Sequence, residues 1–339
     1  MNRCLRQSGR AAFCALRSTA FGWLLVAAVL PVLSAEYPAP AVGDFVLKDF
    51  RFTSGETLPE LRIHYRTIGA PARNLQGLVT NAVLVLHGTT GNGSNFLRAE
   101  FAGELFGKGQ LLDATRYFIV LPDGIGHGQS SKPECCYTRL NFAYDIKLLL
   151  DKLGVAKADV VGHSLGSIIA QTFAEYWPER TRRVVLISST GGWPPGRPRK
   201  TAQFDYAAEI RKLKEPIDAD SPFMVAWWDS PTPVDPDFIR RQRKDAAGIP
   251  LRVWLAVLDQ GLAADAYADL QATLPRLKAP TLLIWGSKDP IMEPEVRQSL
   301  RDALPDAQVK VFEGLGHNPF WEDPRGVAGV INSFLDPQP

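Results

Sequence analysis

Val160-Val161-Gly162-His163-Ser164-Leu165-Gly166-Ser167 contains the pattern G-x-S-x-G. The residues before it, 158–161, are typical of a short buried strand, and the apolar residues after it recur at helical spacing. A serine between a strand and a helix lies on a sharp turn, and the flanking glycines leave room where the two elements approach closely. The next amide N–H is then at a helix N-terminus, where developing negative charge is favoured. The pattern alone also occurs by chance in a chain with 28 glycines, so the interpretation depends on the strand and the helix.

Strand and helix patterns alternate on both sides of this turn. Two strands joined by a turn at 53–56 are expected to be antiparallel, and apolar runs separated by helical periodicity follow them. Such alternation predicts an α/β fold with a mostly parallel, doubly wound sheet covered by helices on both faces. Strands are predicted at 45–52, 58–65, 81–86, 117–121, 158–161, 183–188, 281–286 and 309–312, and helices at 142–153, after 164, at 294–304 and up to about 335.

A long interruption divides the pattern into two parts. Residues 36–192 form the first part of the predicted core and residues 280–339 the second. Between them, residues 193–279 are helical, interrupted by prolines and rich in tryptophan, which predicts an inserted helical cap. Two interpretations of its large apolar side chains stay open: they form a roof over an apolar substrate group, or they build the cap's own core. These side chains are Trp193, Phe223, Met224, Trp227, Trp228, Trp254 and Leu255.

The first 35 residues resemble an export signal. Four arginines and no acidic residue precede the apolar run 21–30, which ends in Pro31-Val32-Leu33-Ser34-Ala35. The apolar run is short for a membrane span, and small residues stand at a plausible cleavage point. We therefore expect residues 1–35 to be a signal peptide and the protein to be periplasmic or secreted. The alternative is an uncleaved anchor, the only case in which we expect a membrane to be a partner.

Composition narrows the class of protein further. With 339 residues, 45% of them hydrophobic and 22% charged, the chain has the composition of an ordinary globular protein. The formal charge is +2, and removing the four N-terminal arginines leaves −2, so nothing suggests a nucleic-acid surface. Neither a metal-ligand spacing nor a nucleotide or flavin fingerprint is present, and no cofactor or metal is expected. Cys135 and Cys136 are adjacent, which is unfavourable for a disulfide, so a role as loop residues is favoured and oxidation of the pair outside the cytoplasm is the alternative.

A serine nucleophile needs a base that is itself held by a third group. Of the five histidines, His317 follows the last predicted strand and is expected at the same sheet edge as Ser164. His87 is interpreted as bracing the glycine-rich loop 87–93, His127 as a loop residue, and His163 as pointing away from the serine. The remaining histidine, His64, lies within an outer strand.

The orienting acid and the oxyanion donors are predicted at the same edge. Asp289 directly follows the strand 281–286, where it can accept the Nδ1 proton of His317. The N–H of Leu165 follows the nucleophile and provides one oxyanion donor. The loop after the strand 81–86 should provide the other donor, which we assign to Thr89 in preference to Thr90.

These motifs together resemble the α/β-hydrolase superfamily from about residue 45 to the end of the chain. The hallmarks are Leu86-His87-Gly88, Gly126-His127-Gly128-Gln129-Ser130, Gly162-His163-Ser164-Leu165-Gly166, Trp285-Gly286 with Asp289, and Gly316-His317. The order Ser164, Asp289, His317 is the order that this superfamily implies. The N-terminal part, from Leu58-Pro59-Glu60-Leu61 to Asn81-Ala82-Val83, resembles the homoserine O-acetyltransferase-like branch, whereas His87-Gly88-Thr89-Thr90-Gly91 and the serine turn are esterase-like.

Serine hydrolysis of a carboxylic ester, lactone or related small-molecule acyl substrate is therefore the leading hypothesis. An O-acyltransferase of the homoserine acetyltransferase type, using the same three residues, is the alternative. Export argues against the transferase, because acetyl-CoA and homoserine are cytoplasmic. A third possibility is a binding or scaffold protein that has kept the fold.

Overall fold

The computed structural model describes residues 37–110, 112–191, 206–262 and 272–335. All of them lie in one compact unit, Ser34–Pro339. The expected signal peptide, Trp193 and the first residues of the expected cap lie outside the described residues. Within the described ranges, no helix is long and apolar enough to cross a membrane.

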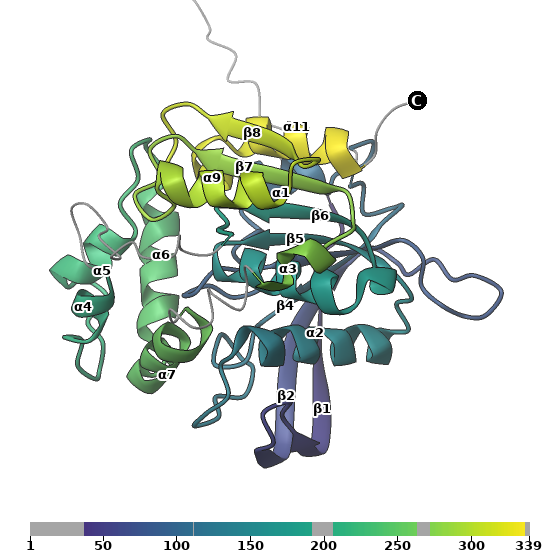
Figure 1. Ribbon diagram of the computed structural model, residues 1–339, viewed down its shortest axis with the longest axis horizontal. Helices are drawn as coiled ribbons and strands as arrows, with labels where there is room; N and C mark the ends of the chain where they lie inside the picture. The colour runs from purple at the N-terminus through teal and green to yellow at the C-terminus, as the bar shows by residue number, and fades with distance from the viewer. Residues whose placement is uncertain (1–36, 111, 192–205, 263–271, 336–339) are drawn as a thin grey trace, which may run out of the picture. The chain divides into compact units, whose positions relative to one another are not determined.

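The described residues form an eight-stranded sheet in the order β1-β2-β4-β3-β5-β6-β7-β8 (Figure 1). β1 and β2 form an antiparallel hairpin, β2 pairs antiparallel with β4, and the six strands from β4 to β8 in this order pair parallel. The predicted α/β fold with a mostly parallel sheet is confirmed. The strands are β1 Ala41–Arg51, β2 Thr57–Ile68, β3 Ala82–Leu86, β4 Phe118–Pro122, β5 Ala158–His163, β6 Thr181–Ile187, β7 Thr281–Gly286 and β8 Gln308–Phe312.

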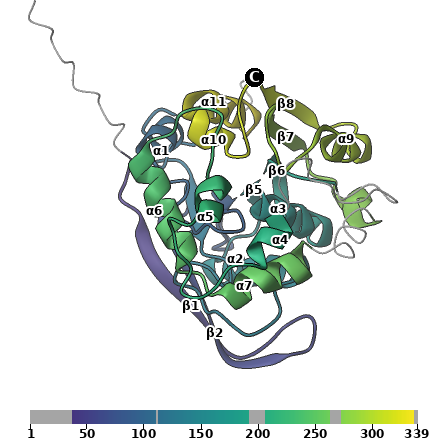
Figure 2. The same ribbon diagram turned by 90° about the vertical axis from the view of Figure 1, so that its left-hand side faces the viewer.

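Helices cover both faces of this sheet. α2, α3 and α9 contribute buried residues to one apolar cluster, and α1, α10 and α11 contribute to a second cluster on the other face (Figures 1 and 2). The helices are α1 Ala99–Leu105, α2 Arg139–Leu153, α3 Leu165–Tyr176, η1 Pro178–Arg180, α4 Tyr206–Ile210, α5 Pro222–Trp227, α6 Pro236–Ala247, α7 Leu251–Ala256, η2 Val257–Gly261, η3 Leu274–Arg276, α9 Pro294–Ala303, α10 Pro319–Glu322 and α11 Pro324–Leu335.

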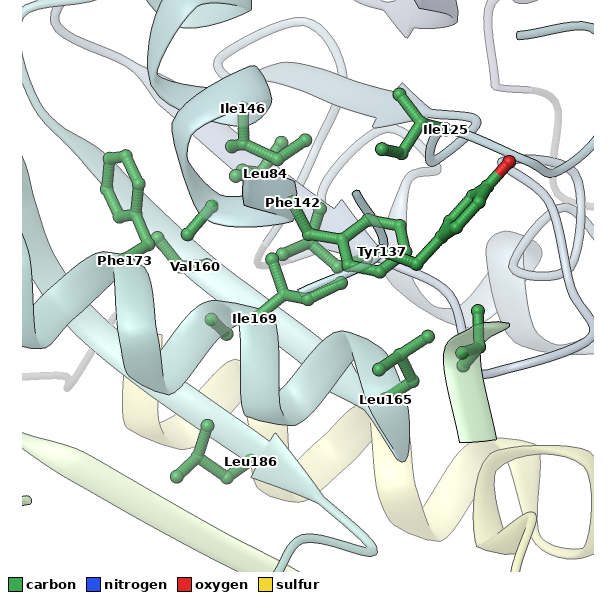
Figure 3. Packing of buried hydrophobic residues seen from close by; sticks show 14 of the residues in the cluster. Leu84, Ile125, Tyr137, Phe142, Ile146, Val160, Leu165, Ile169, Phe173 and Leu186 are labelled. Carbon is green, nitrogen blue, oxygen red and sulfur yellow. The ribbon is translucent and has the colours of Figure 1, made fainter. Parts of the chain in front are cut away.

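The central strands are apolar throughout because both of their faces are covered. Along β3, Leu84 and Leu86 belong to the cluster under α2 and α3, whereas Val83 and Val85 belong to the cluster under α1 and α11. This alternation follows from the two-residue repeat of a strand. Figure 3 shows the first cluster, where Leu84 and Val160 of the strands meet Ile169 and Phe173 of α3. The strand and helix that flank Ser164 are thus held firmly in the core.

In the described part of the segment between β6 and β7, the regular elements are helices joined by turns. Its helices α4–α7 lie beside the sheet, at the left of Figure 1. Phe223, Met224 and Trp254 are buried in the same cluster as α2 and α3. These three side chains therefore build the core beneath the inserted helices, as one of the two interpretations expected.

Cys135 and Cys136 form a disulfide, which is the less favoured of the two interpretations of the pair. The pair lies in the loop between β4 and α2. Cys136 has φ 80°, in the left-handed region that few non-glycine residues adopt, and its carbonyl oxygen accepts a hydrogen bond from Asn141 Nδ2 at 3.1 Å. The loop thus holds the backbone in a conformation that sequence adjacency alone does not reveal.

Candidate active site

Ser164 stands on the turn between β5 and α3, with φ 51° and ψ −121°. The two flanking glycines make this turn possible. A Cβ on Gly162 would lie 2.2 Å from the Gly166 carbonyl oxygen, and a Cβ on Gly166 would lie 2.4 Å from that of Leu86. Strand and helix therefore approach more closely than any side chain allows, as the sequence pattern predicted.

The structure brings Ser164, His317 and Asp289 together. His317 Nε2 lies 3.0 Å from Ser164 Oγ, and His317 Nδ1 lies 2.8 Å from Asp289 Oδ2 and 3.0 Å from Oδ1. Because the carboxylate accepts the Nδ1 proton, Nε2 is left as the acceptor for the serine hydroxyl. The three residues come from the ends of β5, β7 and β8, which share one edge of the parallel sheet.

Asp289 is held as a carboxylate by its surroundings. Its side chain is fully buried, and Oδ1 also accepts the amide N–H groups of Ile291 and Met292 at 2.8 and 3.0 Å. Burial alone would raise the pKa of this carboxyl group, but the charge and hydrogen bond of His317 and the two amides outweigh it and lower the pKa. Asp289 is therefore charged in the neutral range and can stabilise an imidazolium.

His163 is hydrogen-bonded to the backbone of His317, a contact that the sequence did not indicate. Its Nε2 donates to the His317 backbone carbonyl at 2.9 Å, and Ser188 Oγ donates to the same oxygen at 2.8 Å. Burial, followed by the charge of His317, lowers the pKa of His163 to about 3, so its ring is neutral. His163 lines the same pocket as Ser164, and its hydrogen bond fixes the loop that carries His317.

The two predicted oxyanion donors flank the serine. Leu165 is the first residue of α3, where an amide N–H has no intrahelical acceptor. Thr89 lines the same pocket as Ser164, in the loop after β3. The side chain of Thr90 is occupied elsewhere, because its Oγ1 accepts Trp227 Nε1 from α5 at 3.2 Å.

Two buried histidines support the loop that contains Thr89. His87 Nδ1 donates to the Gly88 carbonyl at 2.8 Å and Nε2 accepts the Gly124 N–H at 2.9 Å, which agrees with its expected bracing role. His127 differs from its interpretation as a simple loop residue. It is completely buried, with Nδ1 2.8 Å from the Ile125 carbonyl and Nε2 close to the Thr89 carbonyl.

The pocket around Ser164 has an empty volume of about 390 Å³, including its open mouth. Trp227 and Trp228 line it, so part of the predicted aromatic roof does lie over the serine. Sequence reasoning missed Asn95 and Trp321, which line the pocket from the loop after β3 and from α10. Neither residue stands in a motif, and Trp321 Nε1 reaches the Asn95 carbonyl across 226 positions of sequence.

One group of potential metal ligands occurs in the described part of the chain. Glu56, Cys135 and Cys136 place their ligand atoms within 4.8 Å of one another. The two sulfurs are bonded to each other, and a disulfide sulfur is not the thiolate that binds a metal ion. The two cysteines lie in the loop before α2 and Glu56 lies directly before β2, and none of the three lines the pocket of Ser164.

Residues 81–324 match the family model described as the alpha/beta hydrolase fold. The chain belongs to the α/β-hydrolase fold family. The match includes the serine turn, Asp289 and His317 and covers well over half of this α/β hydrolase.

Relatives of this α/β hydrolase include lipases and other hydrolases. Lipase 3 of Moraxella sp. is 26% identical over 262 residues, which is 75% of this chain and 77% of that protein. A 2-hydroxy-6-oxononadienedioate/2-hydroxy-6-oxononatrienedioate hydrolase of Paraburkholderia phymatum is 28% identical over 286 residues, 81% of this chain and 91% of that protein.

Solved structures with the same fold include a hydrolase and an esterase. The hydrolase from Pseudomonas aeruginosa PA01 is 22% identical, with a TM-score of 0.65 over 84% of this chain and 97% of its own. The esterase from Exiguobacterium antarcticum is 18% identical, with a TM-score of 0.65 over 85% of this chain and 98% of its own. At this identity the similarity extends to the fold alone.

Proposed function

We propose that this protein hydrolyses carboxylic esters, lactones or related acyl substrates by nucleophilic catalysis at Ser164. The observation that carries the proposal is the continuous hydrogen-bonded path from Ser164 Oγ through His317 to Asp289, with distances of 3.0 and 2.8 Å. A serine hydroxyl becomes an effective nucleophile when a positioned imidazole can take its proton.

The chemistry follows from this path. Ser164 Oγ attacks the substrate carbonyl carbon while His317 Nε2 takes the hydroxyl proton, and Asp289 stabilises the imidazolium that forms. The N–H groups of Leu165 and Thr89 hold the oxyanion of the tetrahedral intermediate. His317 then returns the proton to the leaving alcohol, which departs and leaves an acyl group on Ser164. Water, deprotonated by His317, attacks the acyl-enzyme and releases the acid.

The proposal is tested by removing only the nucleophile. Ser164→Ala is expected to lower p-nitrophenyl acetate turnover at least about 10³-fold and to abolish covalent labelling by a fluorophosphonate. Ser333→Ala is the matched control, because Ser333 lies exposed on α11. This variant should keep both the turnover and the label. A correctly folded wild-type protein that is inert to both reagents would refute the proposal.

Acyl transfer to an alcohol is the second candidate. The resemblance of residues 58–83 to the homoserine O-acetyltransferase-like branch favours it, and the same three residues can pass the acyl group to an alcohol instead of water. Product analysis with acceptor alcohols such as homoserine separates the two reactions. Predominant formation of the new ester at millimolar acceptor concentration would support the transferase.

We also propose that the protein is exported. The proposal rests on the basic, acid-free N-terminus and the apolar run that follows it within residues 1–35. A cleaved chain that begins near residue 36 in the periplasm or medium is the expected result. Full-length protein confined to the cytoplasm would contradict it.

A further inference from the structure

We propose that the Ser164 pocket selects uncharged esters that carry a second oxygen atom near the scissile carbonyl, and that the side-chain amide of Asn95 donates a hydrogen bond to that oxygen. The inference rests on the proposed ester hydrolysis and names the class of substrate. Hydroxyacyl, oxoacyl and alkoxyacyl esters belong to this class.

Asn95 is fixed in place on three sides. Its backbone N–H donates to the Asn92 carbonyl at 3.1 Å, and its backbone carbonyl accepts Trp321 Nε1 at 3.4 Å. Its side-chain Oδ1 accepts the Asn92 N–H at 2.9 Å. Because Oδ1 is used in this way, the orientation of the amide is set, and Nδ2 points to the opposite side.

The amide nitrogen is the part of Asn95 that remains available. Asn95 is only 6% exposed, and among the described residues Nδ2 has no hydrogen-bond acceptor. Nδ2 is not one of the fully enclosed side-chain atoms that lack a partner, so water or an acceptor oxygen of a ligand can reach it. The same residue lines the pocket that holds Ser164 and His317.

Gly91 shows where the amide lies. A Cβ on Gly91 would be 2.7 Å from Asn95 Nδ2, so the amide packs directly against the backbone of the loop after β3. Thr89, the proposed oxyanion donor, belongs to that same loop. Thr89 and Asn95 both line the pocket of Ser164, so a substrate whose carbonyl oxygen is bound by the Thr89 amide occupies a pocket that Asn95 also lines. An oxygen a few bonds from the scissile carbon is the group suited to reach it.

The other lining residues indicate an uncharged substrate. The described residues around this pocket include no lysine, arginine, aspartate or glutamate. A carboxylate removed from water needs a cationic partner, and none is found among them. Trp228, another residue of the pocket wall, has a buried Nε1–H that lacks an acceptor in the described structure. The uncharged donors Asn95 Nδ2 and Trp228 Nε1 are suited to bind neutral acceptor oxygens. The indole rings can pack against the apolar remainder of the substrate.

Two nearly isosteric esters test the inference. p-Nitrophenyl methoxyacetate differs from p-nitrophenyl butyrate by an ether oxygen in place of a methylene group. For the wild type, kcat/KM for the methoxyacetate is divided by kcat/KM for the butyrate. After correction by the same ratio of their alkaline hydrolysis rates, this preference for the methoxyacetate should be at least 10. p-Nitrophenyl hemisuccinate, which carries a carboxylate, should be a poorer substrate than the butyrate.

Variants of Asn95 test which group recognises the oxygen. Asn95→Asp keeps an oxygen that can accept the Asn92 N–H but replaces the Nδ2 donor, and Asn95→Ala removes the whole amide. Both are expected to lower the methoxyacetate preference about 10-fold while fluorophosphonate labelling of Ser164 persists. Ser333→Ala, on the surface of α11, serves as the control and should keep the wild-type ratio. If Asn95 has only a structural role, its substitution would lower kcat/KM for both substrates equally and leave their ratio unchanged.

The outcomes separate this inference from the proposed function. Hydrolysis and labelling with no methoxyacetate preference in the wild type would overturn the inference and leave the serine hydrolase standing. This measurement needs no variant, so it decides even if the Asn95 variants do not fold. Wild-type protein that neither labels nor turns over any ester would instead refute the proposed function.

Discussion

At the scale of single residues, two buried histidines near Ser164 are held neutral. Burial, followed by the charge of His127, lowers the pKa of His87 to about 4, and burial, followed by the charge of His317, lowers that of His163 to about 3. Both rings make hydrogen bonds that suit the neutral form. His87 accepts the Gly124 N–H through Nε2, which an imidazolium could not do.

These two pKa values predict that acid destabilises the fold. In the unfolded chain each histidine binds a proton below its ordinary pKa of about 6.5, whereas the folded protein does not bind it until about pH 4 and pH 3. The free energy of unfolding is therefore at its full value above about pH 6.5. It decreases as the pH falls toward the pKa values of the folded protein, by up to about 1.4 kcal/mol per pH unit for each histidine.

Urea denaturation at pH 7.5, 6 and 5 measures this effect. The midpoint should fall as the pH is lowered, and His87→Gln should make the decrease shallower. Glutamine can still accept the Gly124 N–H but cannot take up a proton. An unchanged midpoint between pH 7.5 and 5 would mean that the two rings are not held neutral.

At the scale of elements, the contact between β3 and the start of α3 positions the candidate nucleophile. Gly166 lies in the first turn of α3, and a Cβ there would come within 2.4 and 2.5 Å of the Leu86 and His87 carbonyl oxygens. These atoms are backbone atoms of the central sheet and of the loop that follows it, so displacing them would disrupt the sheet. Any side chain at this position must displace the helix.

Gly166→Ala is therefore expected to destabilise the protein by about 1–3 kcal/mol and to lower kcat/KM at least about 10-fold, because Ser164 and the Leu165 N–H move with the helix. Gly329→Ala is the matched control within α11. No heavy atom lies within 4 Å of its Cβ position, and alanine should add about 0.5–1 kcal/mol of helix stability. Thermal unfolding and esterase assays measure both variants. Wild-type behaviour of Gly166→Ala would contradict the close packing.

At the scale of the whole molecule, the inserted helices are hydrogen-bonded to the loop that contains Thr89, the proposed oxyanion donor. Trp227 Nε1 of α5 donates to Thr90 Oγ1 at 3.2 Å, and Asn92 Nδ2 donates to Asp245 Oδ2 of α6 at 3.3 Å. Both contacts join residues more than 130 positions apart. The position of the roof over Ser164 and the position of the Thr89 loop are therefore coupled.

A double-mutant cycle measures this coupling. Trp227→Phe removes the donor together with part of the indole ring, and Thr90→Val replaces the acceptor hydroxyl by a methyl group. Each is expected to lower kcat/KM several-fold, and the double variant should be scarcely worse than either single variant. The resulting coupling energy should be about 0.5–1.5 kcal/mol, the net contribution of one hydrogen bond. Additive effects of the two substitutions would show that the bond does not position the loop.

Local patterns were sufficient for most of the fold. The serine turn, the strands on either side of it and a helix ending at residue 153 were all predicted, and α2 does end at Leu153, before Gly154 with its left-handed φ of 71°. Such features depend on neighbouring residues and on the repeat of strands and helices. The placement of Asp289 and His317 also followed, since parallel strands end at a common edge.

The features that only the tertiary structure decided involve residues without a local pattern. The Cys135–Cys136 disulfide depends on the fold of one loop, and the bond from His163 to the His317 carbonyl spans 154 positions. Asn95 and Trp321 reach the pocket because the loop after β3 and α10 meet over Ser164. The sequence by itself thus determined the chain order of the three candidate catalytic groups and the sheet that carries them. The shape and polarity of the pocket were decided by long-range packing, because side chains distant in sequence become neighbours only when the core closes.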